Sequence, residues 1–402
     1  MSTGRSMNRR RFLEGAMVTA GACLGAAAAR GVTTAEIVSP SDFAHLAVRV
    51  GDLKEAVAFY DTVLRCRAHH VASRPDTPSR GGAWCSYDIE HHRVSIFGRG
   101  GKPVPDAGLL GWDRFTFSYD SLTELGANYH ALKAGGIEPR AARRYGDSAS
   151  LLYTDPSGNR IEMLLDRFDR IEDLEPYLGE AADLEKSAAG VDFDPDSLPA
   201  PAGAASEENE TVAPSELVHT VIRTRQLEPM IDWYVRALGC EVAERSETLA
   251  LLRFDHRLLR ILLVEDRKRE RGAGNQGYDH FAFEYKTMDE LVVRTYARLK
   301  ESGVKPYWCT NHGMTTSIYY TDPDGNRVET QVDNFPTKAE GLAYIRGPDF
   351  ARNPVGIDFD PDEMVDKVRG GASYEEMHRR VEGPRTTPPP RPVEGVHYQG
   401  AP

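Results

Sequence analysis

Several features that would restrict the function of this 402-residue chain are missing from its sequence. Beyond residue 35, no stretch approaches the ~18 uncharged apolar residues of a membrane-spanning helix. Positive charge is not in excess, because 61 Asp and Glu against 49 Lys and Arg give a formal net charge of −12. That balance argues against nucleic acid and anionic membranes as partners. The five cysteines show no metal-type spacing such as Cys-x-x-Cys. A globular chain remains, long enough for two domains at ~150 residues each.

The first 35 residues differ in character from the rest. Three arginines at residues 9–11 precede Phe-Leu, and a weakly apolar run rich in Ala and Gly continues to Ala29. A basic region, an apolar region and small residues at the end are typical of an export signal. The paired arginines resemble the twin-arginine type, although a basic arm before a short Ala-rich helix is the alternative. We predict a twin-arginine signal peptide over residues 1–35, and hence a periplasmic or extracellular protein.

An internal repeat organises the remaining sequence. Asp-Pro-Ser-Gly-Asn-Arg-Ile-Glu at residues 155–162 recurs as Asp-Pro-Asp-Gly-Asn-Arg-Val-Glu at residues 322–329. A repeat this long indicates duplicated domains rather than a solenoid, whose repeats are shorter. The boundaries that we predict are an N-terminal domain over 41–196, an acidic linker over 197–213, a C-terminal domain over 214–365, and a disordered Pro-rich tail over 366–402.

Each half contains the same succession of hydrophobic patterns. An alternating, strand-like run is followed by a helical run, then by several short strands, and this order occurs twice in each half. The helical runs are residues 53–64, 122–134, 227–238 and 288–301. Each half therefore consists of two strand–helix–strand–strand–strand units.

Three potential metal ligands lie on strand-like runs in the second half. His219 belongs to residues 217–222, His280 to residues 278–283, and Glu329 to the end of the repeated motif. Two neutral imidazoles and one carboxylate can hold Fe(II) on one face and leave the opposite positions open. A lone histidine on a strand is more often a hydrogen-bonded core residue, so the prediction depends on all three residues together.

The segment that ends at Glu329 resembles the signature of extradiol ring-cleavage dioxygenases, because it places His312 and Tyr319 just upstream. The order of elements is similar to that of the vicinal oxygen chelate superfamily over about residues 41–170 and 215–335. The resemblance implies an α+β fold of tandem vicinal oxygen chelate domains. Each domain would consist of two βαβββ units that form a curved mixed sheet around a cavity.

The same resemblance implies a function and a site. The metal would be Fe(II), with Mn(II) as the alternative, bound by His219, His280 and Glu329. A catechol-type small molecule and O2 would be the partners, and the reaction would open the aromatic ring. His312 and Tyr319 would be catalytic. In the alternative without a catalytic role, His312 is an ordinary loop histidine and Tyr319 is a half-buried aromatic residue of a strand.

The two halves differ at one ligand position. The first half keeps His45 and Glu162, but Arg114 stands where the second half has His280. Arginine cannot be a ligand, because it stays protonated and has no lone pair to give. We therefore predict one metal site, in the C-terminal domain, and a structural N-terminal domain.

One residue typical of the family is missing from the second half. Relatives usually carry a further histidine, the acid–base catalyst, where this chain has Leu258 or Leu259. His256 lies nearby, and the first half has His91 and His92 at the corresponding place. Two alternatives therefore stay open: an exported small-molecule-binding protein without turnover, and another metal-dependent enzyme of the superfamily, such as an isomerase, lyase or thiol transferase. A homo-oligomer also stays open.

Overall fold

The computed structural model describes residues 37–102, 111–145, 148–167, 189–200, 211–268 and 277–380. The predicted signal peptide lies outside the described residues, as do residues 381–402 and most of the predicted linker. None of the helices in the described ranges is long and apolar enough to cross a membrane.

Four βαβββ units follow one another along the chain. The first contains β1 (Asp42–Val50), α2 (Leu53–Leu64), β2 (Arg67–Arg74), β3 (Thr77–Ser86) and β4 (Val94–Arg99). The second contains β5 (Gly111–Ser118), α3 (Leu122–Ala134), β6 (Ala141–Tyr145), β7 (Ser148–Thr154) and β8 (Arg160–Leu165). The third contains β10 (Glu216–Thr224), α6 (Leu227–Leu238), β11 (Glu241–Arg245), β12 (Leu249–Arg253) and β13 (Ile261–Glu265). The fourth contains β14 (Tyr278–Glu284), η4 (Asp289–Ala297), α7 (Arg298–Glu301), β15 (Trp308–Asn311), β16 (Thr315–Thr321) and β17 (Arg327–Asp333).

The ends of these helices follow from local sequence. Asp52 and Ser121 precede α2 and α3, and their side chains accept hydrogen bonds from backbone N–H groups of the first turn. Gly239 ends α6 in the left-handed conformation, with a φ of 65° that glycine adopts without steric cost. The fourth predicted helix is mostly a π-helix, η4, which continues into the short α7.

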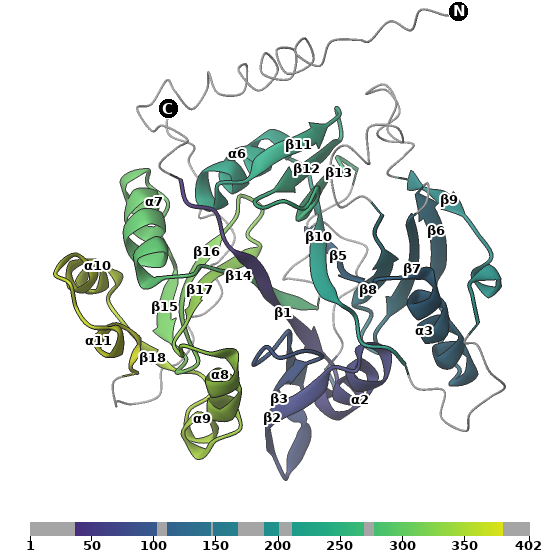
Figure 1. Cartoon of the computed structure of the whole chain (residues 1–402), viewed down its shortest axis with the longest axis horizontal. Coiled ribbons are helices and arrows are strands. Elements are labelled where there is room, and N and C mark those ends of the chain that lie inside the picture. The colour runs from purple at the N-terminus through teal and green to yellow at the C-terminus, as the bar shows by residue number, and fades with distance from the viewer. Residues whose placement is uncertain are drawn as a thin grey trace, which may run out of the picture. The chain divides into compact units, whose positions relative to one another are not determined.

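The described strands form two mixed sheets, and each sheet combines one unit from each half of the chain. The first sheet has the order β18-β15-β16-β17-β14-β1-β4-β3-β2, and the second has β11-β12-β13-β10-β5-β8-β7-β6-β9. The short strands β18 (Ile357–Asp358) and β9 (Val191–Asp192) complete them. The units meet where β1 runs antiparallel to β14 and where β10 runs antiparallel to β5. Figure 1 shows β1 alongside β14, although these strands lie far apart in the sequence.

The predicted fold class is confirmed, with two mixed sheets built from βαβββ units. The pairing of units differs from the prediction, because the first unit shares a sheet with the fourth and the second with the third. The four units have similar hydrophobic patterns, so local sequence does not select the partner of a unit. Tertiary packing does: Phe43 on β1 stacks on Phe283 of β14, with ring centroids 5.2 Å apart, and also contacts Phe281.

The chain continues beyond the fourth unit in four short helices: α8 (Lys338–Ile345), α9 (Pro348–Arg352), α10 (Pro361–Arg369) and α11 (Tyr374–His378). The prediction of a disordered tail from residue 366 is therefore wrong up to residue 380, because α10 and α11 occupy this part. Asp360 and Ser373 cap the N-termini of these helices with their side chains. The prediction extended the Pro-rich character of the last residues too far toward the N-terminus. Ile345 and Phe350 pack against Trp84 of the first unit, and Figure 1 shows α8 and α9 beside β2 and β3.

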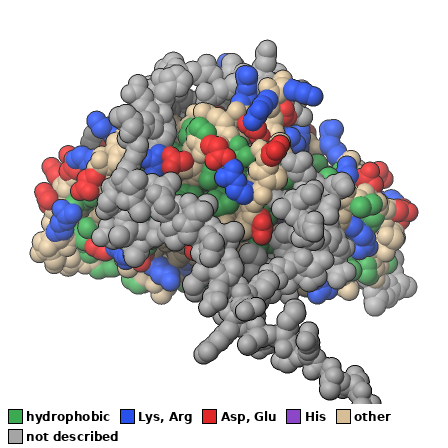
Figure 2. Space-filling model, turned by 90° about the horizontal axis from the view of Figure 1, so that it is seen from above, with side chains coloured by type: hydrophobic (Ala, Val, Ile, Leu, Met, Phe, Trp, Pro, Cys, Tyr) green, Lys and Arg blue, Asp and Glu red, His purple; other side chains and the backbone are tan. Residues whose placement is uncertain are grey.

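The described surface carries both positive and negative side chains on the face shown in Figure 2. In the view of Figure 2, Lys and Arg side chains are interspersed with Asp and Glu over the described part of the face. The net negative charge is therefore not collected into one large acidic patch on that face.

Candidate metal centre and its cavity

Three side chains from both ends of the chain converge in the middle of the first sheet. His45 lies on β1, His280 on β14 and Glu329 on β17, and these strands are neighbours in the sheet. The Nε2 atoms of the two histidines are 3.3 Å apart. Glu329 Oε2 lies 3.2 Å from His45 Nε2 and 3.1 Å from His280 Nε2. All three residues are buried.

This triangle of donor atoms fits a metal ion. Adjacent ligands around an octahedral ion lie about 1.4 bond lengths apart, about 3.0 Å for bonds of about 2.1 Å. Glu329 Oε2 is buried and has no hydrogen-bond partner within the described residues, and such an atom is costly unless something pairs with it. Among those residues, His45, His280 and Glu329 form one of two groups with the spacing of a metal site.

The predicted ligand His219 does not belong to this group. The structure brings together the predicted His280 and Glu329, but their partner is His45. His219 lies on β10 in the second sheet, where its Nε2 is 2.9 Å from Thr116 Oγ1. The repeat had correctly indicated that His45 and His219 are equivalent. It did not show which of the two shares a sheet with His280.

The second sheet contains a counterpart of the site in which an arginine replaces one ligand. Val221 pairs with Arg114 there as Ala47 pairs with His280 in the first sheet. Arg114 Nε donates to Glu162 Oε2 at 2.8 Å, so this carboxylate is paired with a guanidinium. Burial alone would raise the pKa of Glu162, but Arg114 and His219 hold it below its usual value. The prediction that Arg114 marks the position without a ligand agrees with this geometry.

A neighbouring carboxylate fixes the orientation of His280. Its Nδ1 donates to Asp279 Oδ1 at 3.0 Å, which leaves the lone pair on Nε2 directed at the cluster. Asp279 is held in turn by Arg327 at 2.6 Å and by Arg49. Burial alone would raise the pKa of Asp279, but Arg327, His280 and Arg49 hold it well below its usual range. A carboxylate behind a ligating histidine fixes its tautomer and raises its basicity.

Burial and mutual attraction set the charges of the three donor residues. Burial lowers the pKa of His45 to about 4, against the pull of Glu329. Burial alone would raise the pKa of Glu329, but the two imidazoles keep it well below its usual range. Burial alone would lower the pKa of His280, but the negative charges of Asp279 and Glu329 favour its protonated form and raise the pKa. A neutral imidazole and an ionised carboxylate are the forms that bind metal.

A second pair of histidines lies beside the cluster. The ring centroids of His45 and His92 are 4.1 Å apart. His92 Nδ1 is 2.6 Å from His91 Nδ1, and His91 Nε2 is 3.0 Å from Asp333 Oδ1. A carboxylate can only accept, so His91 donates from Nε2 to Asp333. With His91 neutral, its Nδ1 accepts from His92 Nδ1–H, and a neutral His92 keeps the lone pair on Nε2. Burial lowers the pKa of His92 well below its usual value.

The histidine expected near Leu258 or Leu259 in the third unit therefore has a counterpart, His92, in the first unit. Leu258, Leu259 and His256 follow β12 in the second sheet, away from the cluster, and His256 is exposed. The sequence signal was present as His91 and His92, but it lay in the half that had been assigned no metal site.

The predicted catalytic pair also lies at this site. His312 follows β15 and Tyr319 lies on β16, where it is the cross-strand neighbour of Glu329. His312 Nδ1 donates to the backbone oxygen of Val355, so Nε2 accepts from the Tyr319 hydroxyl at 2.9 Å. Burial and the nearby Glu329 raise the pKa of Tyr319 well above its usual value, so the phenol remains protonated. Burial lowers the pKa of His312.

All these groups line one cavity of about 720 Å³. Its wall includes His45, His280, Glu329, His92, His312 and Tyr319. Aromatic side chains form part of the lining, and Trp308 stacks on Tyr319 with ring centroids 4.7 Å apart. The volume lies within the range of small-molecule binding sites.

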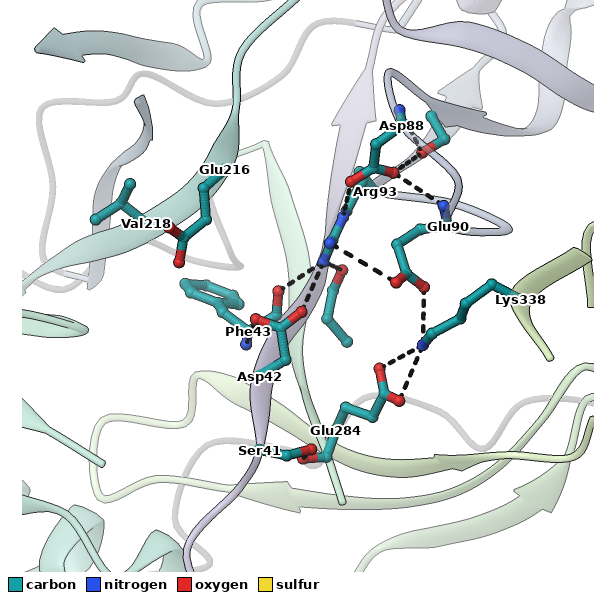
Figure 3. A network of polar contacts seen from close by, with 12 residues as sticks. Ser41, Asp42, Phe43, Asp88, Glu90, Arg93, Glu216, Val218, Glu284 and Lys338 are labelled. Carbon is teal, nitrogen blue, oxygen red and sulfur yellow. Dashed lines mark hydrogen bonds and ion pairs between the residues drawn. The ribbon is translucent and has the colours of Figure 1, made fainter. Parts of the chain in front are cut away.

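The second group with metal-type spacing, Glu90, His91 and Asp333, already has a cation. Lys338 Nζ lies 2.9 Å from carboxylate oxygens of Glu90, Glu284 and Asp333. Figure 3 shows this ammonium between Glu90 and Glu284. We therefore interpret the group as a buried ionic network that supports His91, not as a metal site.

Comparison with known proteins shows the family. Residues 42–163 and 216–330 match the model of the Glyoxalase/Bleomycin resistance protein/Dioxygenase superfamily. These two ranges make up more than half of the chain, and the chain belongs to this superfamily.

The chain is similar to curated dioxygenases. The chain is 36% identical to biphenyl-2,3-diol 1,2-dioxygenase 2 of Rhodococcus globerulus over 178 residues, which are 44% of this chain and 93% of the relative. It is 24% identical to metapyrocatechase 2 of Cupriavidus necator over 241 residues, which are 58% of this chain and 67% of the relative. The prediction of an enzyme of the ring-cleavage dioxygenase kind agrees with these relatives.

Solved structures support the fold alone. A Bacillus subtilis protein provisionally described as a dioxygenase has a TM-score of 0.55 at 13% identity, and the match covers 87% of this chain and 100% of that one. A mutant of glyoxalase I from Zea mays has a TM-score of 0.50 at 16% identity, with 76% and 95% covered.

Proposed function

We propose that this protein is an Fe(II)-dependent extradiol dioxygenase, which opens the ring of a catechol-type substrate with O2. The observation that carries the proposal is the convergence of two kinds of group on one cavity. His45, His280 and Glu329 provide a three-sided ligand set, and His92, His312 and Tyr319 line the same space. The dioxygenase relatives favour the same chemistry.

The ligand set suits Fe(II), with Mn(II) as the alternative. Two imidazoles and one carboxylate on one face are the ligands of non-haem Fe(II) oxygenases, whose remaining positions stay open. An ion bound there would carry net positive charge, hold the two catechol oxygens, and lower the pKa of the substrate hydroxyl.

His92 is the group that we assign to proton transfer. Its low pKa keeps it neutral at physiological pH, and its Nε2 lone pair can accept a proton from a catechol hydroxyl. The contact to His91, which is itself bonded to Asp333, stabilises the imidazolium that results. A positioned base of this kind contributes about 10²–10⁴ in rate.

His312, which follows β15, and Tyr319, on β16, provide two further polar groups in the cavity lining. Tyr319 stays protonated, so its hydroxyl can donate a hydrogen bond to an oxygen of the substrate in place of His312. His312 keeps its Nδ1–H on Val355, which fixes the ring and presents Nε2 to the cavity. The pair therefore provides one donor and one acceptor at fixed positions.

His92 also favours the dioxygenase over a binding protein without turnover. The missing acid–base histidine supported the binding protein, and His92 is a residue of the required kind beside the cluster. The test is to load the protein anaerobically with Fe(II), add a panel of catechols, and then admit air. Oxygen uptake with a yellow ring-opened product supports the proposal. Tight binding of catechols without oxygen uptake would contradict it.

A further inference from the structure

The lining of the cavity has more cationic than acidic side chains. Five cationic residues line it: Arg49, Arg80, Arg99, Lys102 and Arg327. Arg49 and Arg327 share the carboxylate of Asp279 and are thereby neutralised in part. In the described part of the chain, no carboxylate lies at ion-pair distance from Arg80 or Arg99. A cavity with these two groups in its lining attracts anions, although the whole chain is acidic.

Arg80 and Arg99 are placed together by strand pairing. They are direct cross-strand partners in the antiparallel ladder between β3 and β4. Directly opposite residues lie on the same side of a sheet, and like charges at such positions destabilise it. Two cross-strand arginines that both line one cavity repel each other, and an anion bound between them would offset this repulsion.

The second sheet provides an internal comparison. Leu249 pairs with Val264 there as Gly82 pairs with Phe97 in the first sheet. By the 167-residue offset that relates these strands, Glu247 and Asp266 are the sequence equivalents of Arg80 and Arg99. The sheet without the histidine cluster therefore has acidic residues at the equivalent positions. The pair of arginines therefore occurs only in the sheet that contains the histidine cluster, and it is not a general feature of the repeated unit.

Ser95 and Arg99 are separated along β4 by a length that a substituted ring can span. Ser95, Phe97 and Arg99 alternate along β4 and all line the cavity. At about 3.3 Å per residue, the Cα of Arg99 is about 13 Å along the strand from that of Ser95. Between them the wall is apolar and includes Phe97 and Trp84, whose ring centroids are 6.2 Å apart. An arginine side chain can extend back over part of this distance.

We propose that the substrate is a catechol whose ring substituent ends in an anionic group, and that Arg80 and Arg99 bind this group while the diol lies at the histidine cluster. The inference rests on the proposed function for the position of the diol. A carboxylate is the simplest such group, because a guanidinium can bind it with two parallel hydrogen bonds.

The experiment uses two ligands that differ only in charge: a catechol that carries a propanoate chain, and its neutral methyl amide. Binding to the metal-loaded protein is measured without oxygen, and cleavage is measured separately in air. We expect the acid to bind at least tenfold more tightly than the amide, with a preference that declines as salt is raised. In an Arg80→Gln, Arg99→Gln double variant, the preference should fall to about twofold, while the amide binds as before.

Two controls keep the test decisive. Arg143→Gln removes an exposed arginine of the second sheet that pairs with Asp192, and it should leave the preference unchanged. The melting temperature of the double variant should equal or exceed that of the wild type, because a like-charge pair is removed. Equal binding of acid and amide to the wild type would overturn the inference, and cleavage of both would leave the proposed function intact. If the acid is preferred but neither ring is cleaved, the proposed function fails and the anion site stands.

Discussion

The Nε2 atoms of His45 and His280 lie 3.3 Å apart, although 235 residues separate them in the sequence. The distance is short because β1 and β14 are antiparallel neighbours in one sheet, with Ala47 opposite His280. The candidate ligand set thus combines a strand of the first half of the chain with two strands of the second half. Glu329 joins from β17, which runs parallel to β14.

This relationship gives a prediction that separates the two equivalent histidines. His45→Ala should lose metal affinity by more than the ~10–100-fold typical of a partner behind a ligand. His219→Ala is the matched control and should keep about one iron per chain, because His219 contacts Thr116 in the other sheet. Metal analysis of anaerobically purified protein measures both. Normal iron in His45→Ala, or its loss in His219→Ala, would show that the assignment is wrong.

Local sequence predicted the units and many of their boundaries. The helices over residues 53–64, 122–134 and 227–238 occur at the predicted residues, because amphipathic spacing and caps are encoded within a dozen neighbouring positions. The replacement of a ligand by Arg114 was also readable, because it needs only the alignment of the two halves and the chemistry of a guanidinium.

The partner of each unit could not be predicted in the same way. All four units present a first strand with the same alternating pattern, so the pattern permits pairing within a half or between halves. The choice depends on packing across the joint, such as that of Phe43 on Phe283. The structure separates His219 from His280 and Glu329, and it brings His92 beside His45. Both differences from the prediction have this single cause, which the repeat alone does not reveal.

His92→Gln should reduce kcat/KM for a catechol by about 10²–10⁴ while the iron content stays normal. Glutamine keeps a similar size and polarity but cannot take up a proton. His256→Gln provides the control, because His256 is exposed in the second sheet, and its activity should match that of the wild type. Steady-state oxygen uptake on iron-matched samples measures the difference. Full activity of His92→Gln would assign the base to another residue.

The export signal remains a prediction, because residues 1–35 lie outside the described part of the chain. The proposed ligands come from three distant segments, so the site exists only in a folded chain. Twin-arginine export, which carries folded proteins, would suit such a product. Replacing Arg9, Arg10 and Arg11 with lysine should hold the precursor in the cytoplasm without changing its iron content. Cell fractionation tests this, and normal processing of the triple variant would contradict the twin-arginine prediction.

The buried ionic network behind His91 should stabilise the fold. Lys338 contacts three carboxylates, and its side chain is 27% exposed. Lys338→Met leaves these carboxylates without their cation and should cost about 3 kcal/mol. Lys300→Met is the control, because Lys300 pairs with Asp362 on the surface at 46% exposure, where such pairs contribute about 0–1 kcal/mol. Urea unfolding measures both, and equal costs would refute the role of the network.

The cost of Lys338→Met should also depend on pH. Burial and Asp333 raise the pKa of Glu284 to about 7 even with Lys338 present. A carboxyl group with a raised pKa binds protons more readily in the folded state, so its contribution to stability falls as pH rises between about 4.5 and 7. Without the ammonium this trend should steepen, and the variant should lose more stability at pH 8 than at pH 5.5.

In the second sheet, the contribution of Glu162 beside Arg114 to the stability of the fold should depend on pH in the opposite direction. Its guanidinium holds the pKa of Glu162 below the usual value despite burial. A lowered carboxyl pKa adds stability that is present above about pH 4.5 and is lost as pH falls through the folded-state value. In Arg114→Met the pKa of Glu162 should instead rise, because the hydrogen bond that Thr116 Oγ1 donates to Glu162 Oε2 is weaker than the lost guanidinium charge and burial remains. The variant should therefore be less stable at pH 7 by about 3–5 kcal/mol, and this deficit should shrink on acidification to pH 5. Its iron content should stay at the wild-type value, because Arg114 does not contact His45, His280 or Glu329. A loss of iron without a loss of stability would mean that the second sheet, not the first, binds the metal.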